Sequence, residues 1–245
     1  MFGWIADAWR AHGGRKLFRA TAIFFSVTAV ASGVVLWQTA KGSGQAASLS
    51  SLPLAPISSL RSLSPAPDPG PLGPEGVPIP AAHPLASADA PAPGQGVDGI
   101  TAAAAEQLAF HIHAHLTVFV AGAPRQIPYG VGIAPPLEVE PTPQGPFALG
   151  GAAFFSLHTH AADGIIHIES PIVRTYTLGD FFDIWHEPLG PERVGPATGH
   201  VTAFFDGRHY LGNPRDIPLL AHAQLQLDVG RPLVAPESIA FPPGL

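Results

Sequence analysis

The stretch 110–120 reads Phe-His-Ile-His-Ala-His-Leu-Thr-Val-Phe-Val and carries an apolar residue at every even-numbered position. Successive side chains of a strand point to opposite faces, so the apolar residues from Phe110 to Val120 would line one face. His111, His113 and His115 would project together from the other face. The stretch therefore predicts a strand with one face on a hydrophobic core and the other on a ligand site.

A second His-x-His motif, His158 and His160 in the sequence Leu-His-Thr-His, repeats this spacing. Neutral imidazole is the commonest metal ligand, and two imidazoles at i and i+2 of a strand can approach one ion at roughly 2.0 to 2.1 Å. Sulfur ligands are ruled out, because the chain has no Cys and its single Met is Met1. Imidazole ligands suit divalent transition metals, so we predict copper or zinc as the bound ion.

The predicted metal ligands are the clustered histidines and two further histidines that could complete the ligand shell: His111, His113, His115, His158, His160, His167 and His222. Glu169 would share a strand face with His167, where it could be a ligand, orient an imidazole or be a surface residue; we favour the last two. The remaining histidines are isolated in the sequence and are interpreted as surface or hydrogen-bonded residues: His12, His83, His186, His200 and His209.

Composition restricts both the packed part of the chain and its partners. The 245 residues include 29 Pro and 27 Gly, which indicates that much of the chain lies outside a core. Nucleic acid is not expected as a partner, because only 12% of residues are charged, the net charge is -6 and no basic run occurs. No nucleophile elbow, P-loop, dinucleotide fingerprint or His-Glu-x-x-His motif is present, so no catalytic residue is assigned.

An uncharged apolar span occupies residues 20–40, between Arg19 and Lys41. Its length is close to the roughly 20 residues that cross a bilayer, so a single transmembrane helix is predicted. Basic residues precede the span, which places residues 1–19 in the cytoplasm and the rest of the chain outside it, as a membrane-anchored extracytoplasmic protein. The alternative is a cleaved signal peptide.

Residues 41–105 contain 12 of the prolines and show neither helical nor strand periodicity, which predicts a disordered, semi-stiff linker. Residues 106–234 would form a compact histidine-rich domain, and residues 235–245 a C-terminal tail. The fold expected for the domain is mainly β (α+β), a mostly antiparallel sheet with one short helix. Its elements are predicted as strands at 110–120, 125–129, 153–160, 164–169, 201–206 and 223–229, a helix at 177–185 and a loop at 134–151.

Four motifs resemble an uncharacterised family of bacterial membrane-anchored, histidine-rich extracytoplasmic proteins. They are FHIHAHL at 110–116, LHTHAADGIIHIESP at 157–171, YTLGDFFDIW at 176–185 and NPRDIPLLAH at 213–222. The resemblance covers the predicted domain and not the linker, and it implies no established activity. His186, His200 and His209 lie outside the family's motifs.

Three functions are compatible with these patterns. The first is a membrane-anchored extracytoplasmic domain that binds a divalent transition metal through clustered histidines. The second is a zinc-type enzyme in which three histidines hold an ion with a bound water and Glu169 or another histidine moves protons. The third is a metal-free interaction subunit of an envelope membrane complex, whose histidines sense pH or pack on a partner.

Overall fold

A computed structural model describes residues 49–245, which form a compact unit made mostly of β-strands with one α-helix. This confirms the mainly β fold class for that part of the chain. The predicted transmembrane span at 20–40 and the first residues of the predicted linker, up to residue 48, lie outside the described residues. From residue 49 onward, no helix is both long and apolar enough to cross a membrane.

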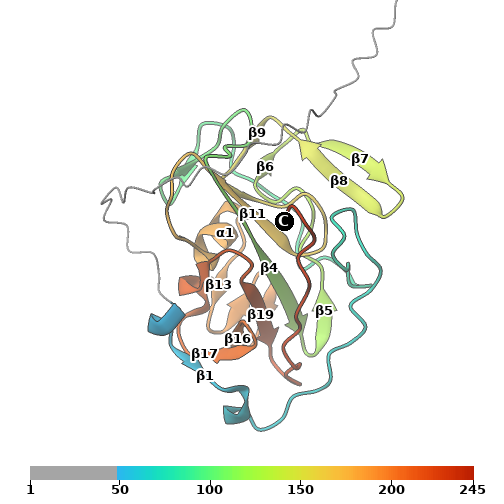
Figure 1. Cartoon of the computed structure of the whole chain (residues 1–245), viewed down its shortest axis with the longest axis vertical. Coiled ribbons are helices and arrows are strands. Elements are labelled where there is room, and N and C mark those ends of the chain that lie inside the picture. Colours follow the sequence, from blue (N-terminus) through green and yellow to red (C-terminus); the bar gives the residue numbers. More distant parts are fainter. Residues whose placement is uncertain (1–48) are drawn as a thin grey trace, which may run out of the picture. The chain divides into compact units, whose positions relative to one another are not determined.

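An eight-stranded sheet organises the unit (Figure 1). Its strands, in spatial order, are β1 (Leu54–Ala55), β17 (Arg208–Tyr210), β16 (Val201–Phe205), β19 (Gln224–Val229), β4 (Phe110–Val120), β11 (Ile165–Ser170) and β10 (Leu157–His158), with β5 (Ala123–Arg125) paired to β4. The pairings are antiparallel except for β19 and β4, which run parallel. The sheet is therefore mostly antiparallel, as predicted.

Strand β4 has the face pattern that the sequence predicts. Ala114, Leu116 and Val118 are buried in the hydrophobic core. Alternate residues of the neighbouring strands, such as Ile166 of β11 and Leu227 of β19, belong to the same core. The residues that complete this face of the sheet are Ile168, Val201, Ala203, Phe205, Leu225 and Val229.

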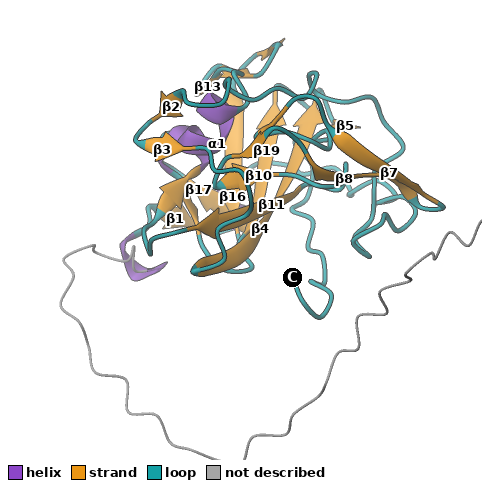
Figure 2. Ribbon diagram, turned by 90° about the horizontal axis from the view of Figure 1, so that it is seen from above, coloured by secondary structure: helices purple, strands orange, loops and turns teal. Residues whose placement is uncertain are grey.

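The predicted helix is confirmed as α1 (Leu178–Ile184). Thr177 caps it, because the Thr177 hydroxyl accepts from the Asp180 amide at 3.2 Å while the Asp180 carboxylate accepts from the Thr177 amide at 2.8 Å. Phe181, Phe182 and Trp185 bury their rings in the same core as β4. Through these rings the helix packs on the apolar face of the sheet (Figure 2). By strand alternation, the histidines of β4 lie on the opposite face.

Short elements complete the fold. The small sheets pair β2 (Gly96–Val97) with β3 (Ile100–Thr101), β6 (Ile133–Ala134) with β9 (Ala153–Phe154), β7 (Glu138–Thr142) with β8 (Gly145–Gly150), β12 (Tyr176–Thr177) with β18 (Pro218–Leu219), and β13 (Leu189–Gly190) with β14 (Arg193–Val194) and β15 (Ala197–Thr198). The 3₁₀ turns are η1 (Leu49–Ser51), η2 (Ile57–Ser59) and η3 (Pro214–Asp216).

Three local predictions need correction. The strand predicted at 153–160 is divided into β9, which pairs with β6, and β10, which pairs with β11. The segment 134–151, predicted as a loop, contains the hairpin β7–β8, which projects from the body in Figure 1. Its prolines lie in a two-stranded ribbon, where ladder hydrogen bonds are few, so the Pro content did not prevent pairing. The return strand predicted at 125–129 ends at Arg125, because the next amide, of Gln126, instead donates to the His83 carbonyl at 3.2 Å.

The structure also differs from the prediction of a disordered linker over residues 49–105. Val77, Leu85, Ala90 and Ile100 are buried. Hydrogen bonds tie the segment to itself and to the domain, for example from the Leu85 amide to the Gln126 carbonyl at 2.9 Å. These anchors are single apolar residues among prolines, so they leave no periodicity in the sequence.

The predicted C-terminal tail covers the polar face of β19. Gln224 accepts from the Ile239 amide at 2.7 Å, and Gln226 accepts from the Glu237 amide at 3.0 Å. The Pro-rich segment joins the last part of the chain through Ser64, whose amide donates to the Leu233 carbonyl at 2.7 Å. The segments on either side of residues 106–234 therefore pack against that stretch within the described part of the chain.

Candidate metal centre

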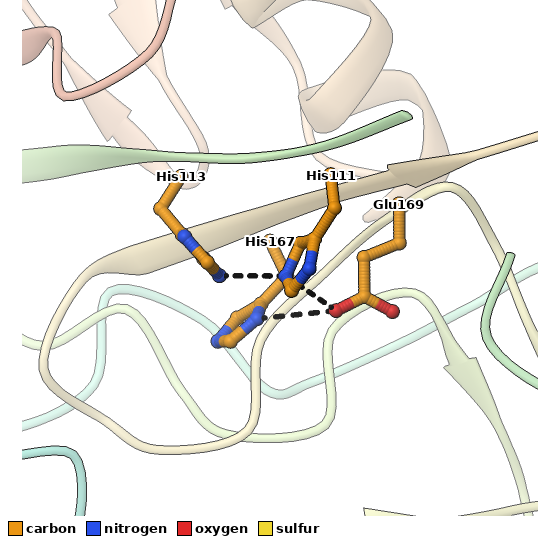
Figure 3. A group of neighbouring side chains, drawn as sticks. All are labelled: His111, His113, His167 and Glu169. Atoms are coloured by element: carbon orange, nitrogen blue, oxygen red, sulfur yellow. Dashed lines mark hydrogen bonds and ion pairs between the residues drawn. The ribbon is translucent and has the colours of Figure 1, made fainter. Parts of the chain in front are cut away.

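Strand register brings the two His-x-His motifs together. His113 of β4 lies opposite His167 of β11, and His167 lies opposite His158 of β10, so three imidazoles form one row across the sheet. His111 lies opposite Glu169 in the adjacent position. Residues that lie directly opposite each other, or two apart on one strand, share a face of the sheet. The side chains of His111, His113, His167 and Glu169 therefore project to the same side, as Figure 3 shows.

The first group contains His111, His113, His167 and Glu169, whose ligand atoms all lie within 4.8 Å of one another. The Nε2 atoms of His111 and His113 are 3.0 Å apart. Glu169 Oε1 lies 3.2 Å from His111 Nε2 and 3.6 Å from His167 Nδ1. His111 has a side chain 36% exposed and Glu169 one only 4% exposed, so the group lies at the rim of the buried face.

The second group contains His158, His160 and His167, all buried. His158 Nδ1 lies 2.9 Å from the Phe155 carbonyl oxygen, and His160 Nδ1 lies 2.5 Å from the Ala148 carbonyl oxygen. A carbonyl only accepts, so each Nδ1 must carry the proton. The two Nε2 atoms, 3.1 Å apart, then face each other with lone pairs. Neutral imidazoles cannot form a hydrogen bond in this arrangement.

A third group, Glu106, His158 and Glu169, connects the first two. Glu169 Oε2 lies 3.9 Å from His158 Nε2, on the side away from the His111 contact made by Oε1. Glu106 Oε1 lies 3.3 Å from His160 Nε2, with its side chain 34% exposed. Glu169 therefore faces both His-x-His motifs, one with each carboxylate oxygen.

Glu75 comes from the Pro-rich segment and contacts the cluster through His167. Its Oε1 accepts from His167 Nε2 at 2.8 Å, and both side chains are under 10% exposed, at 5% and 8%. The second oxygen of Glu75 is buried without a hydrogen-bond partner, as is Oε2 of Glu169. A buried carboxylate oxygen without a donor is costly, so these atoms indicate a position for a cation.

Burial and mutual repulsion determine which imidazole is charged. Burial opposes the charged form of His167, but hydrogen bonds to Glu169 and Glu75 outweigh it and raise its pKa to about 9. Burial, followed by repulsion from His167, lowers the pKa of His113 to about 3, and the same causes lower the pKa of His158 and His160. Neutral imidazole is the form that binds a metal, so these three are prepared to act as ligands.

The backbone around the second motif is held by packing and hydrogen bonds. Thr159 donates to the Pro128 carbonyl at 2.7 Å and accepts from the Val131 amide at 3.1 Å, which fixes the residue between the two histidines. Phe147 of the β7–β8 hairpin stacks on the His160 ring with centroids 5.0 Å apart. Phe154 lies edge-on to His158 at 5.4 Å. The aromatic rings exclude water from this side of the cluster.

Two predicted ligands lie apart from the groups found among the described residues. His115 Nε2 donates to the Asp163 carbonyl at 2.9 Å, next to the turn that leads into β11. His222 donates to the Leu245 carbonyl at 2.9 Å and stacks on Phe241. Alternation placed His115 on the same face as His113. It could not show that the residue opposite His115 on β11 is Ile165, whereas the residue opposite His113 is His167.

Three of the five histidines interpreted as surface or hydrogen-bonded residues have partners of that kind, and His12 lies outside the described residues. His186 contacts Asp89, His200 contacts Glu192 and His209 contacts Ser59. Sequence reasoning missed Glu75 and Glu106 as members of the cluster. Both lie in or next to the segment predicted as a linker, and no motif surrounds them. Glu169, interpreted from the sequence as a ligand, a partner of an imidazole or a surface residue, is buried and contacts histidines of both groups.

Comparison with protein families, with characterised proteins and with solved structures found no match.

Proposed function

We propose that this protein binds a divalent transition metal, copper or zinc, through His111, His113, His158, His160 and His167. The observation that carries the proposal is the pair His158 and His160. Their Nδ1 protons are committed to backbone carbonyls, so their Nε2 lone pairs converge at 3.1 Å. A shared cation satisfies both lone pairs. A backbone carbonyl on the other ring nitrogen is also how proteins orient histidine ligands.

The nitrogen separations fit one ion between each pair. With metal–nitrogen distances of about 2.0 to 2.1 Å, two ligands lie about 2.9 Å apart at a right angle and about 3.3 Å apart in a tetrahedron. The two His-x-His pairs, at 3.0 Å and 3.1 Å, fall between these values. Copper(II) favours the right-angled arrangement and zinc the tetrahedral one, so the geometry supports both ions and excludes neither.

Charge supports a cation at the same place. Two oxygens in the cluster, Oε2 of Glu75 and Oε2 of Glu169, are buried without a hydrogen-bond donor. Hard or borderline cations bind carboxylate oxygen together with imidazole nitrogen. A bound ion would compensate the carboxylate charge and the imidazole lone pairs together.

The cellular setting of the proposal rests on the sequence. The apolar span at 20–40, with basic residues before it, supports an anchor that holds the metal-binding unit outside the cytoplasm. The buried cluster, enclosed by the Pro-rich segment, favours capture or storage of an ion over turnover of a substrate. The role we propose is thus a membrane-anchored extracytoplasmic metal carrier or buffer.

The test is metal content and thermal stabilisation of the full-length chain purified without a histidine tag. We expect stoichiometric Cu²⁺ or Zn²⁺ after dialysis, and a higher unfolding temperature when either ion is added. The double variant H158Q/H160Q removes the converging lone pairs while keeping similar volume, and it should lose the stabilisation. The matched control H200Q/H209Q changes two histidines outside the cluster and should keep it. Absence of bound metal and of stabilisation in the unmodified chain would refute the proposal.

A further inference from the structure

We infer that the cluster holds two metal ions bridged by the carboxylate of Glu169, a conclusion that rests on the proposed function and makes it more specific. The two His-x-His pairs lie on either side of His167. The His113 ring is 4.6 Å from the His167 ring, and the His158 ring is 5.4 Å from it, both measured between centroids. Each pair is already close enough to share an ion of its own.

Four ligands are available to each ion. The first ion would take His111, His113, one oxygen of Glu169 and the Nδ1 atom of His167, whose Nδ1 proton it would displace; these groups lie within 4.8 Å of one another. The second would take the pair His158 and His160 with Glu106 and the other oxygen of Glu169. His158 groups with Glu106 and Glu169, and His160 Nε2 is 3.1 Å from His158 Nε2 and 3.3 Å from Glu106. Four ligands satisfy copper or zinc.

The orientation of Glu169 fits a bridge. Its Oε1 faces the first group at 3.2 Å from His111 Nε2, and its Oε2 faces the second at 3.9 Å from His158 Nε2. Oε2 has no hydrogen-bond donor although it is buried. A single ion between His111 and His113 would leave that oxygen without a partner. Paired metals in proteins are spaced about 3.5 to 4 Å apart, a distance that one carboxylate spans.

The carboxylates around the cluster carry charge for two divalent ions. Glu75, Glu106 and Glu169 contact its histidines. Ionised, these three carboxylates would offset three of the four positive charges that two divalent ions carry.

The experiment is a stoichiometric titration of the tag-free full-length chain with Cu²⁺ or Zn²⁺, with bound metal counted after equilibrium dialysis. We expect two ions per chain. Each ion has one partly exposed ligand, so H111A and E106Q should fold as the unmodified chain does and each retain one ion. H200A and E138Q are the matched surface controls and should retain two. With Cu²⁺, two bridged ions couple magnetically, so the electron paramagnetic resonance signal should account for fewer spins than the copper ions bound. In E169Q, which lacks the bridging carboxylate, the signal should account for all the bound copper.

The outcomes separate the two conclusions. One ion per chain in the unmodified protein, lost in H158Q/H160Q, refutes the bridge and keeps the proposed function. No ion at all refutes both. Two ions that persist undiminished in H111A, E106Q and E169Q would place the second ion elsewhere and also refute the bridge.

Discussion

Glu75 is expected to strengthen metal binding by orienting His167. Its carboxylate accepts from His167 Nε2 at 2.8 Å, so it holds the imidazole with Nδ1 turned toward Glu169 and the first ion. Carboxylates that orient a metal-binding histidine in this way change metal affinity by about 10- to 100-fold when mutated. That range corresponds to about 1.4 to 2.7 kcal/mol. E75Q keeps a hydrogen-bond acceptor at the same place and removes only the charge.

The effect can be read from metal-dependent unfolding. At a metal concentration 100 times the dissociation constant, a single site stabilises the unmodified chain by about 2.7 kcal/mol. The same concentration should stabilise E75Q by only about 0.4 to 1.4 kcal/mol, because its dissociation constant is 10- to 100-fold higher. Calorimetric titration measures the affinities directly.

The control for E75Q is E138Q, the same substitution at an exposed position of β7. It changes the net charge equally and should leave the affinity as it is. An E75Q affinity within twofold of the unmodified chain would refute this account of Glu75. An increased affinity would show that His167 binds through Nε2 and that Glu75 competes with the metal.

Three further predictions concern other parts of the structure. G132A should destabilise the fold by at least about 2 kcal/mol and weaken metal binding. Gly132 has φ of +71°, and a Cβ there would clash with the Leu157 carbonyl oxygen, beside His158. Chemical denaturation measures the first effect and metal titration the second. H222A should bind metal as the unmodified chain does, and a lost ion would return His222 to the ligand set. Burial raises the pKa of Asp228 to about 6 from 3.8, so its folded form holds the proton more tightly than its unfolded form and stability is lost as pH rises from about 4 to above 6. D228N should remove this loss, gaining up to about 3 kcal/mol relative to the unmodified chain between pH 4 and pH 7; a constant difference in unfolding free energy across that range would contradict the assignment.

Most of the sheet could be predicted because its strands alternate clearly. The pattern of 110–120 defines both faces of β4, and Thr177 with Asp180 marks the start of α1 by its capping box. The Pro-rich segment could not be predicted to pack. Val77, Leu85 and Ile100 are buried one at a time between prolines, and no periodic signal distinguishes such anchors from a free linker.

The candidate site, too, could be predicted only in part. The spacing of its two His-x-His motifs could be recognised in the sequence, and it places His111 and His113 on one side of β4. His160 lies beyond the end of β10 at His158. The pairing of His113 with His167 and of His167 with His158 depends on strand register, which alternation alone does not specify. Glu75 joins the cluster across 92 residues of sequence, so only the folded structure reveals it.

The most direct test of the central claim is anomalous X-ray diffraction at the copper or zinc absorption edge, from crystals of the tag-free chain grown with that ion. The account predicts an anomalous peak about 2.0 to 2.1 Å from the Nε2 atoms of both His158 and His160. Anomalous peaks confined to exposed histidines such as His200, with none at His158 and His160, would contradict it.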